Sequence, residues 1–193
     1  LVYAFNHEEA IRSFEAAAQQ DPQAAMPYWG IALALGPNIN SAMEKKNAHR
    51  AIEMVQKARR MADRATPVEQ AYIDALVTRY VGRKGAKRKR LDEVYAKAMR
   101  LVAQQFPEDA DAATLFAEAL MDLRPWDLWK PDGEPQPGTD EIVTTLESVL
   151  TKTQTSNVII YTVALFDPTA PEANPKLLER LAAGAAVADR AAR

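Results

Sequence analysis

The sequence predicts an all-α protein in which consecutive helices pack in pairs, and three observations support this prediction. Hydrophobic residues make up 48% of the chain, glycines number only 7 and alanine is abundant, which suits closely packed helices better than a sheet. Apolar residues recur at helical spacing in one segment after another. Proline or glycine ends several of these segments, as at Asp21-Pro22 and Gly36-Pro37.

The composition also limits the possible functions. Charged residues make up 26% of the chain and the formal net charge is −2, so we expect no bulk attraction to nucleic acid or to a membrane surface. No apolar run approaches the roughly 18 residues that a membrane-spanning helix needs. The chain has no cysteine, which excludes disulfides, thiolate catalysis and zinc–sulfur sites but leaves the compartment open.

The first helix is expected over residues 6–21, where Asn6 suits the N-cap and two glutamates favour the positive end of the helix dipole. A second helix is expected over 24–35, and its stop at Gly36-Pro37 opens a loop. The next helix follows from the small–large–small pattern of Ala51, Val55 and Ala58.

The second pair of helices begins at Thr66-Pro67, because threonine can cap a helix and proline suits its first turn. A basic loop at 82–90 separates the two members of this pair, and Pro107 ends the second. The apolar positions expected to face the core are Ile73, Leu76, Val77 and Tyr80 in the first member and Tyr95, Met99 and Val102 in the second.

The third pair is expected at 109–123 and from Thr139 onward, separated by the proline- and glycine-rich stretch 124–138, which is not helical. The apolar run 157–166 resembles a strand when taken alone. We assign it to a helix because the spacing of the preceding pairs continues through it and tertiary context overrides propensity. A proline-rich loop at 168–175 and an alanine-rich segment follow.

The spacing of small and aromatic positions resembles that of the tetratricopeptide repeat (TPR), a helix–turn–helix unit of about 34 residues. The residues that carry the resemblance are Ala10, Phe14, Ala17 and Pro22, followed by Tyr28, Ile31, Ala32 and Leu35. The resemblance implies a right-handed α-α superhelix, or α-solenoid. It divides the single array 1–193 into a partial repeat at 1–22, repeats with inserted loops at 23–63, 67–107 and 110–154, and a degenerate repeat or cap at 157–193. The chain is therefore expected to be a fragment of a longer protein.

Three stretches narrow the resemblance further: FNHEEAIRSF, YWGIALALGPNIN and DLRPWDLWKPDGEPQPGTDEI. They look like a mostly uncharacterised bacterial subgroup of TPR proteins with long loops inside each repeat. Members of that subgroup often carry export signals. The resemblance thus implies a bacterial protein, periplasmic or exported rather than cytoplasmic, although the residues themselves leave the localisation open.

Every insertion falls at the same turn, between the first and second helix of its repeat. Stacked repeats place equivalent turns along one edge, and insertions on one face often mark a binding face. The edge that carries 36–50, 81–94 and 121–141 is therefore the predicted functional surface. Part of each insertion can equally belong to longer helices.

The predicted partner-binding residues are Trp126, Trp129, Arg124, Asn38, Asn40 and Trp29. The two tryptophans of the longest insertion either anchor a peptide or small ligand, or fold back to give the loop its own small core. The two asparagines either bind a ligand backbone or shape the turn after Gly36-Pro37. Trp29 either packs in the core or faces the concave groove that first helices line in TPR arrays.

Other candidate sites have simpler interpretations. The basic run that contains Arg88 is more consistent with a solvated loop than with a nucleic-acid site, because no aromatic residues interleave with it. His7 lacks the second histidine of an HExxH motif, so it is expected to be a packing or surface residue rather than a metal ligand. No residue spacing indicates catalysis, a cofactor or a metal.

The sequence therefore predicts a non-catalytic protein–protein interaction scaffold, which binds a protein segment or stabilises an assembly through its concave groove and loop edge. The alternative is a small-ligand or metal-binding protein whose pocket includes His7 and the tryptophan-containing loop. Neither a nucleic-acid partner nor a membrane span is expected. The oligomeric state is left open.

Overall fold

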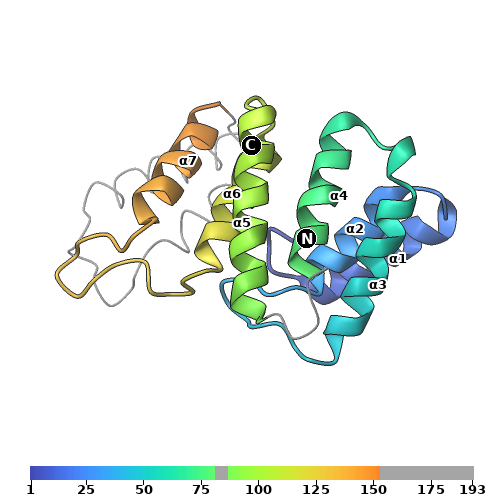
Figure 1. Cartoon of the computed structure of the whole chain (residues 1–193), viewed down its shortest axis with the longest axis horizontal. Coiled ribbons are helices and arrows are strands. Elements are labelled where there is room, and N and C mark those ends of the chain that lie inside the picture. Colours follow the sequence, from blue (N-terminus) through green and yellow to red (C-terminus); the bar gives the residue numbers. More distant parts are fainter. Residues whose placement is uncertain (81–86, 153–193) are drawn as a thin grey trace, which may run out of the picture.

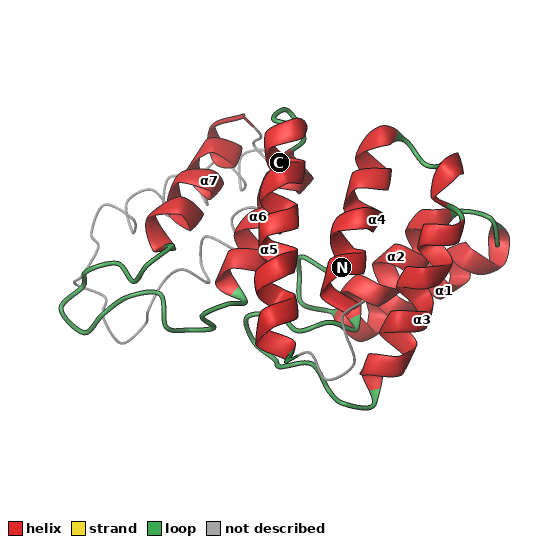
Figure 2. Cartoon of the chain, in the orientation of Figure 1, coloured by secondary structure: helices red, strands yellow, loops and turns green. Residues whose placement is uncertain are grey.

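The computed structural model describes residues 1–80 and 87–152. Its helices are α1 (His7–Gln20), α2 (Ala25–Ala34), α3 (Asn47–Arg60), the 3-10 turn η1 (Ala62–Arg64), α4 (Pro67–Tyr80), α5 (Arg88–Gln105), α6 (Ala110–Met121) and α7 (Thr139–Lys152). Figure 2 shows only helices and loops in this part of the chain, so the all-α prediction is confirmed there. The helix expected at 157–166 and the final segment lie outside the described residues.

The helices pack in chain order, each against the one before and the one after it (Figure 1). In addition, α2 contacts α4, so first helices of neighbouring pairs also meet. This arrangement is compatible with an α-solenoid. Among residues 1–80 and 87–152, no helix combines the length and the apolar character needed to cross a bilayer.

First and second helices differ in how much of their circumference is buried. In α2, α4 and α6, buried residues lie all around the helix, whereas α3 buries only the stripe formed by Ala51, Val55 and Ala58. A helix that is apolar all round needs neighbours on every side, while a single apolar stripe suits an outer helix. The first helices therefore form the inner layer, and the positions predicted to face the core are buried.

Capping explains where two of the first helices begin. The Thr66 hydroxyl and backbone N–H both donate to Glu69 Oε2 at 2.8 Å, and the Glu69 N–H donates back to Thr66 Oγ1 at 3.4 Å. This reciprocal capping box starts α4. Asp109 caps α6 by accepting from the Ala112 N–H at 2.9 Å. Asn6 occupies the predicted N-cap of α1, but its side chain makes no capping hydrogen bond in the described structure.

A second, smaller core lies between α6, α7 and two of the inserted loops. Ile39 of the first loop is 1% exposed and Leu128 of the third loop is also buried. They pack in one cluster with Ala117, Met121, Ile142, Leu146 and Val149. The buried Thr139 hydroxyl donates to the Leu128 carbonyl at 2.6 Å and fastens the loop to the start of α7. Both loops are thus integral parts of the fold.

Candidate functional site

The described parts of the insertions meet at one edge, as the repeat spacing predicts. Residues 37–43, the start of α5 and residues 122–126 line a single cavity of about 480 Å³, which we call the loop-edge pocket. Figure 1 shows the loops before α3 and before α7 on the same side of the array. Residues 81–86 lie outside the described part of the chain.

The two tryptophans of the longest loop have different environments. Trp126 is 56% exposed, and its φ of 58° is in the left-handed region that a bulky residue seldom adopts. Trp129 is half-buried and packs against the second core. Trp129 therefore packs in the loop's own core, as one interpretation of the sequence held, whereas the Trp126 ring is exposed and its role as an anchor stays a prediction.

Arg124 holds the loop in shape. Its guanidinium donates to Asp127 Oδ2 at 2.8 Å, and the Gln136 amide donates to Asp127 Oδ1 at 3.2 Å. These bonds brace the backbone on either side of Trp126. In this loop conformation the Trp126 ring is exposed, on a backbone in the left-handed region.

Asn38 and Asn40 both line the loop-edge pocket, but their roles differ. The Asn40 N–H donates to Asn38 Oδ1 at 2.9 Å, and the Asn38 backbone pairs in both directions with Ser41. Asn38 therefore shapes the turn, as one interpretation of the sequence held. The exposed Asn40 side-chain amide has no hydrogen-bond partner within the described residues.

A buried ionic cluster forms the floor of the loop-edge pocket. Arg79, at the end of α4, donates to Asp92 Oδ1 at 2.9 Å and to Asp122 Oδ2 at 2.6 Å. Arg88 donates to Asp92 Oδ2 at 3.1 Å and to the Arg79 carbonyl. The cluster joins the ends of α4 and α6 to the start of α5. Arg88 is consequently part of a helix and of this cluster, so the prediction that it belongs to a solvated loop is wrong.

Burial governs the protonation of this cluster. Burial raises the pKa of Asp122 to about 6, although the positive charge of Arg79 opposes that rise. Burial alone would lower the pKa of Arg79, but the carboxylate of Asp122, together with Tyr80, Tyr95 and Asp92, raises it, and the net shift is upward. Asp122 Oδ1 is buried and has no hydrogen-bond partner in the described structure.

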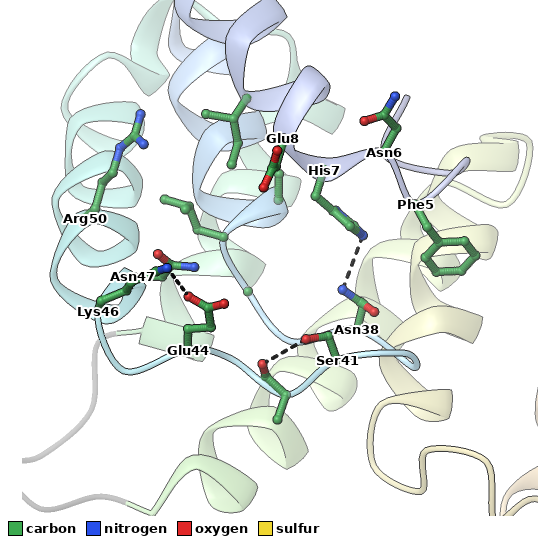
Figure 3. A pocket seen from close by; sticks show the side chains of 15 residues that line it. Phe5, Asn6, His7, Glu8, Asn38, Ser41, Glu44, Lys46, Asn47 and Arg50 are labelled. Carbon is green, nitrogen blue, oxygen red and sulfur yellow. Dashed lines mark hydrogen bonds and ion pairs between the residues drawn. The ribbon is translucent and has the colours of Figure 1, made fainter.

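His7 and Asn38 meet in a neighbouring cavity of about 580 Å³ between the N-terminal ends of α1 and α3, the His7 pocket (Figure 3). Asn38 Nδ2 lies 3.2 Å from His7 Nε2. Because Asn38 Oδ1 already accepts from Asn40, Nδ2 must donate and Nε2 must accept. This requires a neutral imidazole with its proton on Nδ1. Burial correspondingly lowers the pKa of His7.

Charged residues of both signs line the His7 pocket. Glu8 and Glu44 lie among its lining residues together with Lys46 and Arg50. Lys46 pairs with Glu44 at 2.8 Å, and Arg50 pairs with Glu15. Within residues 1–80 and 87–152, no three histidine, aspartate or glutamate side chains gather as metal ligands.

Trp29 lies in a third cavity, of about 480 Å³, which is lined by residues of α2, α4 and α6 and which we call the groove. Its indole N–H donates to the Tyr72 carbonyl at 3.2 Å, and its ring lies against the Tyr72 ring. Tyr28 beside it is buried. Of the two aromatic neighbours, Trp29 is thus the one that faces the groove.

Residues 1–3 also line the groove. The Tyr3 hydroxyl donates to Asp111 Oδ1 at 2.6 Å, and the Tyr3 ring packs against both cores. Burial and the neighbouring carboxylate raise the pKa of this hydroxyl. A non-helical segment of the chain is therefore bound across the inner helices.

No family model, curated protein or solved structure matches this chain. The resemblance to TPR proteins accordingly stays a prediction that rests on residue spacing, and the pockets are interpreted from their own chemistry.

Of the residues predicted to bind a partner, Asn38, Asn40 and Trp126 line one cavity, Trp29 lies in the groove, and the side chains of Arg124 and Trp129 make contacts within the loop and the second core. Sequence reasoning missed Tyr3 and the Arg79 cluster. A signal for Arg79 exists, because this arginine interrupts the buried face of α4 beside Tyr80. No comparable signal marks Asp122, which is 43 positions away.

Proposed function

We propose that this chain is a non-catalytic interaction scaffold, a right-handed superhelix of the TPR type that binds a protein segment in its groove. The observation that best supports the proposal is the seating of residues 1–3 across the inner helices. Residues 1–3 already occupy part of the groove through the half-buried ring of Tyr3 and its hydrogen bond to Asp111. The remaining cavity of about 480 Å³ is large enough for one or two further side chains.

The lining of the groove indicates what kind of segment fits. Met26, Trp29, Leu33, Val68 and Leu115 provide apolar walls. Glu69, Asp109 and Asp111 are its charged lining residues, and no lysine or arginine is found among the described residues that line it. The groove therefore suits a segment that presents an apolar side chain next to a basic one.

The test is a selection of short random peptides displayed on phage, followed by affinity measurements with labelled synthetic peptides. We expect the selected sequences to pair an apolar residue with lysine or arginine. Asp111→Lys should weaken their binding at least about tenfold. Asp74→Lys is the matched control, because Asp74 is exposed on α4 outside the groove and its replacement should leave the affinity unchanged. Equal affinity for both variants would contradict the proposal.

A small polar ligand in the His7 pocket is a second candidate function, because His7 and Asn38 do meet there. Its test is the His7 ring signal in NMR during titration with zwitterionic metabolites, with His49 as the internal reference. His49 is exposed on α3, so a ligand of the His7 pocket should shift the His7 signal alone. Identical small shifts of both histidines would argue against this function.

A further inference from the structure

One wall of the loop-edge pocket is apolar. Met43, Leu123, Pro37 and Pro125 line it, and the exposed ring of Trp126 stands at its margin. The Trp126 ring lines this pocket and is still 56% exposed, on a backbone in the left-handed region. An exposed tryptophan beside an apolar hollow is the usual form of an interaction hot spot.

The charge that this pocket presents to solvent is positive. Its two carboxylates, Asp92 and Asp122, are both engaged by arginines, and their side chains are 10% and 1% exposed. Lys89, by contrast, is exposed and has no ion-pair partner among the described residues. The start of α5 adds to the positive potential, because its first turn holds no acidic residue.

We propose that the loop-edge pocket is a second docking site, which binds a protein segment with acidic residues on either side of an aromatic or large aliphatic side chain. Trp126 and Met43 enclose the apolar side chain, and Lys89 pairs with a carboxylate. The free amide of Asn40, at the rim, hydrogen-bonds the backbone of the segment. The partner of this site is opposite in charge to the partner of the groove, whose rim carries Asp109 and Asp111.

The same phage-displayed peptide selection tests this site independently of the groove. We expect a second class of selected peptides, enriched in aspartate and glutamate around a single phenylalanine, tryptophan or leucine. For labelled peptides of this class, Trp126→Ala should reduce affinity at least about tenfold. Lys89→Glu should reduce it about three- to tenfold, with a larger effect at low ionic strength.

Two matched controls separate the pocket from general surface effects. Leu101→Ala removes an exposed apolar side chain elsewhere on α5, which is 64% exposed. Lys97→Glu reverses an exposed charge on the same helix away from the pocket. Both should leave the affinity within about twofold of the wild-type value. Asp111→Lys should likewise leave the affinity for acidic peptides unchanged while it lowers the affinity for basic ones. The proposal for the loop-edge pocket and the proposal for the groove can therefore fail independently of each other.

Three results would overturn the proposal. The first is that the selection yields no class of acidic peptides. The second is that acidic peptides bind the Trp126→Ala and Lys89→Glu variants with unchanged affinity, in variants whose unfolding midpoint equals that of the wild type. The third is concentration-dependent self-association, measured by sedimentation, that Trp126→Ala abolishes. That result would assign the pocket to a second copy of this chain.

Discussion

Replacing Arg79 by leucine tests whether the buried ionic cluster holds α4, α5 and α6 together. Arg79 is 2% exposed and is the group that pairs with both Asp92 and Asp122. The variant leaves the Asp122 carboxylate, whose side chain is 1% exposed, without a counter-charge, while Asp92 keeps its pair with Arg88. Removing one partner from a buried ion pair costs about 3–5 kcal/mol, because the other charge stays buried without compensation.

The assay is equilibrium unfolding in urea, monitored by circular dichroism. With an m-value of about 2 kcal/mol per molar urea, the expected loss lowers the unfolding midpoint by about 2 M. Since domains of this size are stable by about 5–15 kcal/mol, the variant should still fold in the absence of urea. If it does not, Asp122→Asn offers a milder change, for which we expect a loss of about 1–3 kcal/mol.

The matched control is Arg50→Leu, which removes an arginine whose pair with Glu15 is about half exposed. Solvent screening limits the contribution of that pair, so the free energy of unfolding should change by at most about 0.5 kcal/mol. The reasoning is refuted if Arg79→Leu shifts the midpoint no more than Arg50→Leu does. In that case the cluster would be replaceable by apolar packing.

Three further predictions concern single contacts. Thr66→Ala removes the hydroxyl of the capping box at the start of α4, and urea unfolding should show a loss of about 1 kcal/mol. Gly30→Ala places a methyl group into the Phe14 ring, which must move, so a loss of about 1–3 kcal/mol is expected, and an unchanged midpoint would disprove the close approach. The His7 pKa, read from its NMR titration, should lie below the ordinary value of 6.5, because burial and the donor Asn38 favour the neutral ring. The stability that His7 contributes is therefore fully present above pH 6.5 and is lost as the pH falls through its native pKa; Asn38→Ala should raise that pKa.

Helix positions could be predicted from the sequence because spacing alone determines which face is buried. Ala51, Val55 and Ala58 repeat at helical intervals, and all three are buried in α3. The loops carry no such period. Ile39 is among the most buried residues of the chain, yet nothing in its local sequence distinguishes it from a solvated loop residue. Its burial depends on Leu128, which is distant in sequence.

The sequence indicated which residue types belong to the candidate sites, but not how their side chains are oriented. Trp126 and Trp129 have the same chemistry three positions apart, yet Trp126 is 56% exposed and Trp129 packs against the second core. Composition and spacing also do not reveal that Arg124 and Gln136 both donate to Asp127, the residue after Trp126. Tyr3 was missed for a related reason, since its partner Asp111 is 108 positions away.

The bond between Arg79 and Asp122 has a consequence for engineering. Helical arrays are commonly lengthened or shortened by copying or deleting one hairpin, since each unit contacts only its neighbours. In this chain the Arg79 guanidinium at the end of α4 forms an ion pair with the Asp122 carboxylate at the end of α6. If an extra hairpin were inserted between them, Arg79 and Asp122 would be separated, and each buried charge would lose its partner. Any redesign that changes the number of units must therefore move these two residues together.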